Sequence, residues 1–258
     1  MGKNTYDPNK TPRTKGFQRP FTPEQVFSWC GQVITNILFY GLAISFASRN
    51  QDSYSRRGNT ALIIAHTCIV FLSLGPWLFL ENHNPVDPSV FSKLLPDTRR
   101  WTTMIYCRVH RKQILGVDHF CTWLNVTIAR SNYVPFVVLA FCGSLQFAVQ
   151  LAWGVLIFTS WRGPAVAAMG TSLDPHAVAF QVFTGLEVAV SVVIFVSYIM
   201  LLSFHAYLGS FGLSTYDFLF GERRRANRGK VDHGRMNLKK SIRGKEVLVA
   251  SGEVVEGG

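Results

Sequence analysis

Four stretches of the chain are apolar and almost free of charge, and polar segments separate them. They run over residues 26–47, 60–80, 133–161 and 178–204, and Glu187 in the last is the one charged residue among them. A transmembrane helix needs about 20 mostly apolar residues, so each stretch is long enough to cross a bilayer. Thr22 followed by Pro23 is typical of a helix start, because Thr caps free N–H groups and Pro fits the first helical position. The pattern predicts an all-α integral membrane protein with four transmembrane helices.

The polar segments divide the chain into five parts. We predict an N-terminal arm at 1–24, helices 1 and 2 within 25–80, an insert at 81–132, helices 3 and 4 within 133–204, and a basic tail at 205–258. The arm is polar, basic and rich in proline, so we expect it to be mobile, with a C-terminal part that is free to lie along the membrane surface. The insert carries Pro85, Pro88 and Pro96, and we expect it to be largely irregular.

The positive charges predict which helix ends face the cytosol. Of the 26 Lys and Arg residues, 5 lie in the arm, 7 in the insert and 10 in the tail, whereas residues 48–60 hold 3 and residues 161–177 hold 1. Cytosolic segments of membrane proteins are enriched in Lys and Arg, so we place both termini and the insert in the cytosol. This topology, with anionic lipid headgroups as counterpart, explains the net charge of +11. We therefore expect a lipid bilayer as partner and no nucleic acid. The location can be an endomembrane, such as that of the ER or Golgi, or the plasma membrane.

The candidate chemistry lies in the insert, where Asp118, His119 and Cys121 stand within four residues. A free thiol is mostly protonated at neutral pH, so a nucleophilic cysteine needs a nearby base. An imidazole is the usual base, and a carboxylate can orient it. We expect Cys121 to be the nucleophile, His119 the general base and Asp118 the group that orients His119. Short motifs also occur by chance in buried loops, so the surrounding residues decide.

The surrounding residues resemble the cysteine-rich domain of DHHC protein S-acyltransferases, the palmitoyltransferase family. The resemblance covers residues 106–136 and rests on Cys107, Arg108, Gly116, Asp118, His119, Cys121, Trp123, Leu124, Asn125, Asn132 and Tyr133. Phe120 stands where the family has its second His, so the chain would be a divergent member. The family has four transmembrane helices with this domain on the cytosolic side between the second and third. The layout predicted here is the same.

A second match follows the fourth predicted helix. The family has a Thr-Thr-x-Glu motif there, and this chain has Ser214, Thr215, Tyr216 and Asp217, which keep a hydroxyl and a carboxylate. The resemblance implies that this element packs against the catalytic segment. Thr215 would then be the residue that hydrogen-bonds Asp118.

The resemblance also implies a reaction and its partners. Cys121 would take a long-chain acyl group from acyl-CoA, typically palmitoyl-CoA, as a thioester, and pass it to membrane-proximal cysteines of cytosol-facing substrate proteins. Arg108, Arg111 and Lys112 are candidates to hold the CoA phosphates. The positive-inside bias explains these three cations equally well.

The family's two structural zinc ions are not expected here. Each tetrahedral site needs four ligands, and only Cys107 and His110 stand at ligand positions. The other ligand positions hold residues such as Tyr106, Gln113 and Thr127. We predict no bound metal and no permanently bound cofactor, and expect apolar packing to replace zinc. That small core would contain Ile114, Leu115, Val117, Phe120, Trp123 and Leu124.

Two other functions stay open. The missing zinc ligands favour a catalytically inactive relative that serves as a membrane scaffold or adaptor, although such a protein has no need to keep Asp118, His119 and Cys121 together. Glu187 favours a small transporter or channel, because charged groups inside a membrane are often functional. A single such charge, and a nucleophile outside the membrane, favour the acyltransferase.

Overall fold

The structure is a computed structural model that describes residues 11–170 and 174–221 of the 258-residue chain. The described residues fall into two units, one up to Ser214 and one from Thr215 onward. All the labelled helices and strands belong to the first unit. Most of the predicted basic tail, from residue 222 onward, and the first ten residues of the predicted arm lie outside the described residues.

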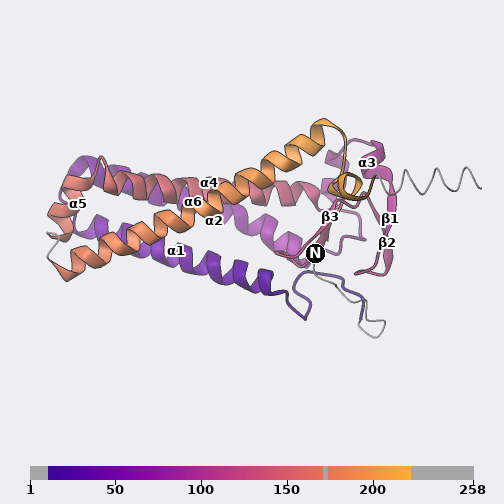
Figure 1. The fold of residues 1–258 in the computed structure, drawn as a ribbon, viewed down its shortest axis with the longest axis horizontal. Helices are drawn as coiled ribbons and strands as arrows, with labels where there is room; N and C mark the ends of the chain where they lie inside the picture. Colours follow the sequence, from indigo (N-terminus) through magenta and orange to yellow (C-terminus); the bar gives the residue numbers. More distant parts are fainter. Residues whose placement is uncertain (1–10, 171–173, 222–258) are drawn as a thin grey trace, which may run out of the picture. The chain divides into compact units, whose positions relative to one another are not determined.

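Within the described residues, four helices confirm the four predicted spans. They are α1 (Pro23–Arg49), α2 (Ser53–Asn82), α4 (Tyr133–Phe158) and α6 (Pro175–Ser210), each long and apolar enough to cross a membrane. They form one bundle in which α4 packs against both α2 and α6 (Figure 1). The predicted start of α1 is confirmed, because Thr22 Oγ1 accepts a hydrogen bond from the Gln25 N–H at 3.2 Å and Pro23 is the first helical residue.

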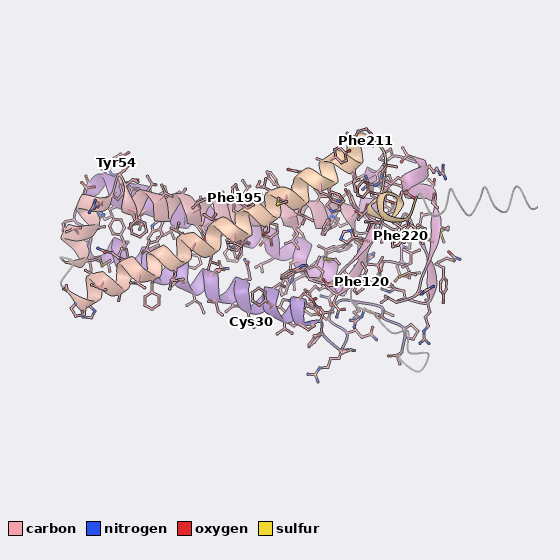
Figure 2. The ribbon with its side chains drawn as sticks, in the orientation of Figure 1. Cys30, Tyr54, Phe120, Phe195, Phe211 and Phe220 are labelled. Carbon is pink, nitrogen blue, oxygen red and sulfur yellow. The ribbon has the colours of Figure 1, made fainter. Side chains whose placement is uncertain are left out.

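The two ends of the bundle carry different structures. A short helix that the sequence did not predict, α5 (Arg162–Met169), lies at one end, and the insert lies at the other (Figure 1). Tyr54 of α2 is at the α5 end and Phe120 of the insert at the opposite end (Figure 2). The candidate nucleophile, next to Phe120 in sequence, therefore sits where the membrane-spanning helices end.

The insert is more regular than its prolines suggested. It contains a short 3₁₀ helix, η1 (Val90–Leu94), a helical turn, α3 (Arg99–Thr102), and two antiparallel hairpins. The first hairpin pairs β1 (Met104–Cys107) with β2 (Lys112–Leu115), and the second pairs β3 (His119–Cys121) with β4 (Val126–Ile128). Each hairpin is too short to be stable alone, so its position depends on what packs against it.

Two apolar cores hold the first unit together. One lies inside the bundle around Phe39, Phe46 and Trp153, all fully buried. The other joins the insert to the bundle: Val126 and Ile128 of β4 pack with Leu80 at the end of α2 and with the start of α4. Burying a Val or Ile side chain contributes roughly 1.5–3 kcal/mol, so the second hairpin is anchored on the helices by its own strand.

Buried polar side chains link the helices inside the bundle. Gln150 Nε2 of α4 lies 3.0 Å from His66 Nε2 of α2, and His66 Nδ1 lies 3.1 Å from the Tyr40 hydroxyl of α1. On the other side, the Ser191 hydroxyl of α6 is 3.2 Å from Gln150 Oε1 and 3.0 Å from Glu187 Oε1. Glu187, the residue that favoured a transporter, is thus a member of a network that joins four helices.

The N-terminal arm is fixed over its described part. We expected mobility, and this is wrong for residues 11–22, because their polar groups bond to the insert. The Arg13 N–H donates to Val109 O at 3.1 Å, and the Thr22 hydroxyl donates to Thr122 O at 2.5 Å. The arm therefore contacts both hairpins of the insert.

Candidate active site

Cys121 is the last residue of β3, in the hairpin that packs on the bundle. His119 pairs with Ile128 and Cys121 pairs with Val126 across this hairpin. Asp118 precedes β3, and its N–H extends the ladder by donating to Ile128 O at 2.8 Å. Because β4 is fully buried, the pairing fixes the backbone of all three candidate residues.

The turn that follows Cys121 is held by Asn125. This residue adopts a left-handed φ of 53°, which Asn tolerates better than most residues. Its side-chain amide donates to Gln25 Oε1 at 3.0 Å and to Pro20 O at 3.2 Å. Gln25 in turn donates to Glu81 Oε2 at the end of α2, at 3.1 Å. The arm and the ends of α1 and α2 thus position the turn that follows Cys121, a role that the sequence did not reveal.

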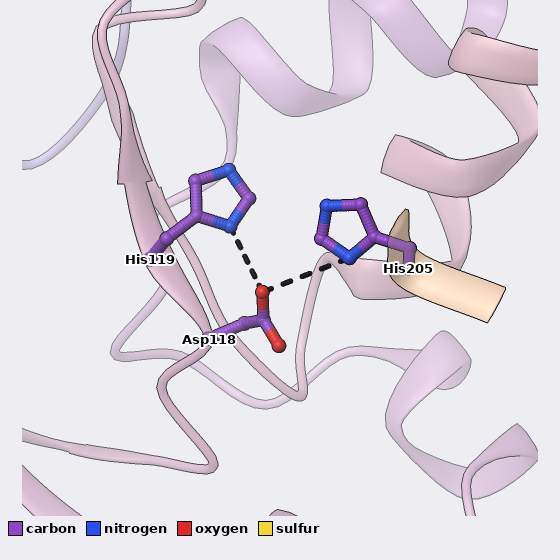
Figure 3. Close-up of side chains that lie close together, drawn as sticks. All are labelled: Asp118, His119 and His205. Carbon is purple, nitrogen blue, oxygen red and sulfur yellow. Dashed lines mark hydrogen bonds and ion pairs between the residues drawn. The ribbon is translucent and has the colours of Figure 1, made fainter. Parts of the chain in front are cut away.

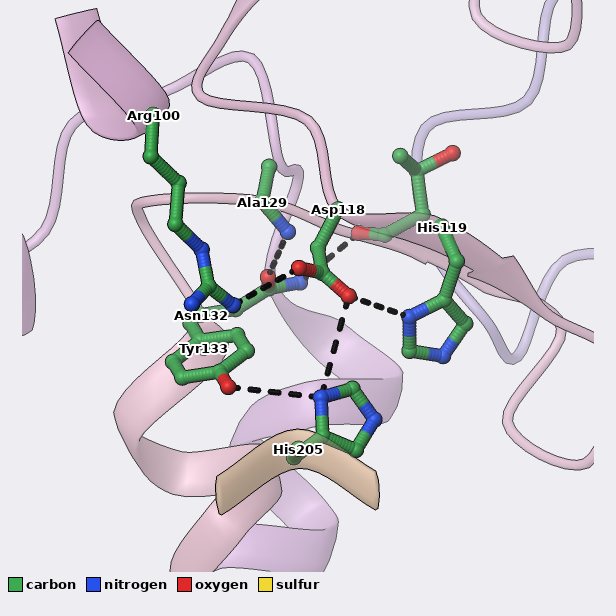
Figure 4. Close-up of polar contacts among 8 residues, drawn as sticks. Arg100, Asp118, His119, Ala129, Asn132, Tyr133 and His205 are labelled. Carbon is green, nitrogen blue, oxygen red and sulfur yellow. Dashed lines mark hydrogen bonds and ion pairs between the residues drawn. The ribbon is translucent and has the colours of Figure 1, made fainter. Parts of the chain in front are cut away.

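Asp118 is fully buried and its two oxygens have different partners (Figure 4). Oδ1 accepts from the Arg100 guanidinium at 2.9 Å, and Oδ2 lies 2.9 Å from His119 Nδ1. A buried carboxylate needs a compensating charge, and Arg100 supplies it from α3. Arg100 also lies over the rings of Trp101 and Tyr133, at 4.2 and 4.9 Å from their centroids. The predicted Asp118–His119 pair is therefore present, with a buried cation behind it.

His119 joins Asp118 to Cys121. Its Nδ1 faces Asp118, which leaves Nε2 as the nitrogen that can interact with Cys121. Burial opposes the charged form of His119, but its interactions with Asp118 and Cys121 outweigh burial and raise its pKa to about 9. His119 is thus an imidazolium at neutral pH. Such a group beside a cysteine stabilises the thiolate that acts as nucleophile.

The structure adds two residues that sequence reasoning missed, His205 of α6 and Tyr133 at the start of α4. His205 Nδ1 lies 3.9 Å from Asp118 Oδ2 and 3.3 Å from the Tyr133 hydroxyl (Figures 3 and 4). A lone His near the end of an apolar stretch carries little signal, and Tyr133 appeared only as a family match. The fold brings both beside Asp118, although His205 is 87 positions further along the chain.

The ligand positions of the family's zinc sites do not fit a metal ion in this chain. His110 Nδ1 lies 2.6 Å from Arg13 O and therefore carries the proton, so Nε2 accepts from the Thr127 hydroxyl at 3.1 Å. Thr127 Oγ1 also lies 3.5 Å from the Cys107 sulfur. Two ligands and a hydroxyl do not make a tetrahedral zinc site. The Cys107 and His110 side chains are instead occupied by contacts with Thr127 and with the arm.

A second group of potential metal ligands lies within the active site itself. Ligand atoms of Asp118, His119 and His205 come within 4.8 Å of one another. The Arg100 guanidinium already neutralises Asp118, and a metal cation would have to displace it. The three residues therefore fit a metal cation poorly.

The apolar core expected in place of zinc is present in part. Ile114, Val117 and Leu124 are buried, at 1, 7 and 7% exposed. Leu115 and Trp123 are exposed, at 40 and 50%, so they were wrongly placed in this core. Leu115 points outward because strand residues alternate between faces and its neighbour Ile114 points inward.

The candidate CoA-binding cations lie at the tip of the first hairpin. Arg108 and Lys112 are exposed and Arg111 is partly buried in the β1–β2 turn, and their role stays a prediction. Another cation of the insert has a different task. The Arg130 guanidinium donates to Ser92 O at 3.1 Å and to Asp97 at 2.6 Å, and so holds the loop before α3.

Thr215 begins a helical segment over residues 215–221. This segment belongs to the second compact unit. The hydrogen bond expected between Thr215 and Asp118 stays a prediction.

Comparison with known proteins points to one family. Residues 97–221 match the family model described as DHHC palmitoyltransferase. The chain is also similar to a protein of Arabidopsis thaliana named "Probable protein S-acyltransferase 20", with 29% identity over 125 residues. The alignment covers 46% of this chain and 17% of that relative. The matched residues contain Arg100, Asp118, His119, Cys121, Tyr133 and His205, and the family is one of multi-pass membrane proteins. Residues 97–221 therefore form a domain of the DHHC palmitoyltransferase family.

Proposed function

We propose that this protein moves a long-chain acyl group, such as palmitoyl, from acyl-CoA to cysteines of other proteins through a thioester on Cys121. The observation that carries the proposal is the buried Asp118, which holds His119 beside Cys121 at the end of a membrane-spanning bundle. A scaffold needs no such arrangement.

The residues support a two-step reaction. The Cys121 thiolate attacks the thioester carbon of acyl-CoA, and the departing CoA sulfur takes the proton from His119. The substrate cysteine then gives its proton to His119 and attacks the acyl-Cys121 thioester, which restores the Cys121 thiolate. Because its pKa is about 9, His119 can act as acid in the first step and as base in the second. Asp118 keeps Nε2 directed at the sulfur in both steps.

An exposed aromatic pair supports a location of Cys121 at the membrane surface. The ring centroid of Trp123, two residues after the nucleophile, lies 6.2 Å from that of Phe27 of α1. Both side chains are at least half exposed. Aromatic residues are enriched at membrane–water interfaces. The acyl chain would enter the hydrocarbon layer there, while Arg108, Arg111 and Lys112 hold CoA phosphates on the cytosolic side.

Protease protection should then place residues 1–24, 81–132 and 205–258 in the cytosol. A cytosolic loop at residues 48–60 would overturn this membrane topology.

Thr215 supports the site in this proposal by donating its hydroxyl to Asp118. The Thr215→Ala variant should acylate itself more slowly while it stays folded, because the carboxylate is less well held. Loss of one such hydrogen bond costs about 1–3 kcal/mol. An unchanged rate would mean that residues 214–217 only end a helix.

Labelling with a long-chain acyl-CoA tests the proposal. The purified protein should acquire an acyl group that hydroxylamine releases, and Cys121→Ser should abolish it because an alkoxide is far harder to form than a thiolate. Cys107→Ser is the matched control, since Cys107 lies in the other hairpin of the insert. Labelling that disappears with Cys107→Ser and survives Cys121→Ser would contradict the assignment. No labelling of the folded protein would favour the scaffold.

A further inference from the structure

His205 and Tyr133 form a buried extension of the active site that the two-step reaction does not yet use. His205 is 6% exposed, and its ring centroid lies 5.5 Å from that of His119 and 5.2 Å from that of Phe136. The guanidinium of Arg100, which neutralises Asp118, lies over the Tyr133 ring at 4.9 Å from its centroid. Tyr133 thus lies between Arg100 and His205.

The hydrogen bonds assign the tautomer of His205. The O–H of the buried Tyr133 needs an acceptor, and His205 Nδ1 lies 3.3 Å away. Nδ1 is 3.9 Å from Asp118 Oδ2, beyond hydrogen-bond distance. Nδ1 therefore accepts from Tyr133, and the neutral ring carries its proton on Nε2.

The position of this Nε2–H relative to the nucleophile is visible in Figure 3. In both His119 and His205 the Nε2 atom lies on the side of the ring away from Asp118. Nε2 of His119 is the atom left for Cys121, because Nδ1 is bound to Asp118. Because the two rings lie 5.5 Å apart, the His205 N–H lies on the same side of Asp118 as the His119 nitrogen that is left for Cys121.

We propose that His205 is a catalytic residue whose Nε2–H stabilises the oxyanion in both acyl-transfer steps, an inference that rests on the proposed function. When the Cys121 thiolate bonds to the carbonyl carbon, the C=O π electrons move to oxygen, and this oxygen accepts a hydrogen bond from His205. The electron pair then re-forms C=O, the bond to the CoA sulfur breaks, and that sulfur takes the proton of His119. The second step forms the same oxyanion on acyl-Cys121. A fixed donor aimed at developing charge stabilises the transition state more than the substrate.

Variants of His205 test this role in the full-length protein, with palmitoyl-CoA as substrate. His205→Leu removes the donor, and the rate constant for acylation of Cys121 should fall about 100- to 1,000-fold, with the palmitoyl-CoA concentration for half-maximal rate unchanged. His205→Gln keeps an N–H donor and should recover part of the rate. His176→Leu is the matched control, because His176 is exposed near the start of the same helix. It should leave the rate unchanged.

The pH profile separates catalysis from positioning. The alkaline loss of rate belongs to His119, so it should stay at about pH 9 in His205→Leu if His205 only donates to the oxyanion. A shifted alkaline loss, or a Gln variant as slow as the Leu variant, would show that His205 acts through Asp118 and His119 and would overturn the proposal. A Leu variant at the wild-type rate would also overturn it.

Two further observations keep the test decisive. If His205→Leu does not fold, Tyr133→Phe tests the same step, because loss of the phenol proton lets His205 place its own proton on Nδ1. A wild-type rate for Tyr133→Phe would contradict the assigned tautomer and the proposal. An unlabelled wild-type protein would instead refute the acyltransferase itself, so the two failures are distinguishable.

Discussion

The two hairpins of the insert share one fold and differ in what their polar residues do. In β1–β2, Cys107 and His110 bond to Thr127 and to the arm, so each donor meets an acceptor within a closed network. In β3–β4, Asp118 bonds to Arg100 and His119, and His119 interacts with Cys121 on its other side. The Cys121 side chain is partly exposed. In the first arrangement the polar groups are paired with one another. The second places the charged His119 beside the Cys121 sulfur.

This difference shows how a domain can lose metal ligands and keep its reactive group. At the family's zinc-ligand positions this chain has residues such as Tyr106, Gln113 and Thr127, and other contacts hold the insert. The arm bonds to Val109 and Thr122, and Asn125 bonds to Gln25. Shape and reactivity depend on separate residues, so one set can change without the other.

The largest difference between the hairpins is expected for their two histidines. His119→Ala should lower the rate of acylation about 100- to 10,000-fold, because it removes the acid–base group next to the sulfur. His110→Ala should leave the rate per folded molecule unchanged and lower the free energy of unfolding by about 1–3 kcal/mol, because the buried Thr127 hydroxyl loses one of its two partners and Arg13 O loses the His110 donor. Acylation kinetics and thermal unfolding in detergent measure both. Equal losses of rate would contradict the division of tasks.

The same two histidines should respond to pH in opposite directions. The pKa of His119 is raised to about 9, so its contribution to stability is complete below its unfolded pKa of about 6.5 and is lost as pH rises through about 9. Acylation should fall over the same alkaline range. Burial lowers the pKa of His110, against the hydrogen bond to Arg13 O, so this residue destabilises the fold as pH falls below about 6.5. The free energy of unfolding, measured from pH 5 to 10, checks both directions. His119→Gln should remove the alkaline loss of stability, and His110→Gln should remove the acid loss.

Thr127→Val should have a smaller effect, confined to stability. Val keeps the volume and removes the hydroxyl that links His110 and Cys107, so the buried His110 and the half-buried Cys107 each lose a partner. The expected loss is about 1–3 kcal/mol of unfolding free energy with acylation unchanged. Thr102→Val is a control, since the Thr102 hydroxyl bonds to Thr98 O on the exposed side of α3. A large loss of acylation with Thr127→Val would show that the contact between Thr127 of β4 and the first hairpin takes part in the reaction.

The helices were predictable because each depends on its own residues. The length and apolarity of four stretches gave α1, α2, α4 and α6, and Thr22-Pro23 marked the start of α1. The triad of Asp118, His119 and Cys121 was visible because its members are neighbours in sequence. Arg100, Tyr133 and His205 were not visible as site residues, because only packing of α3, α4 and α6 brings them to Asp118. The ordered arm was missed for the same reason: its proline-rich residues are held by backbone contacts with distant segments, which composition does not show.

The smallest effect should follow removal of metal ions. If hydrogen bonds and the arm hold the insert, a strong zinc chelator should change neither the melting temperature nor the acylation rate, and the purified protein should contain far less than one zinc per chain. Cys107 and His110 could still bind zinc weakly, but two ligands release it readily. Cys107→Ser gives the matched comparison, since its melting temperature should respond to the chelator as the wild type does. Stoichiometric zinc, or a melting temperature that falls with chelation in the wild type and not in Cys107→Ser, would show that the first hairpin has kept a metal site.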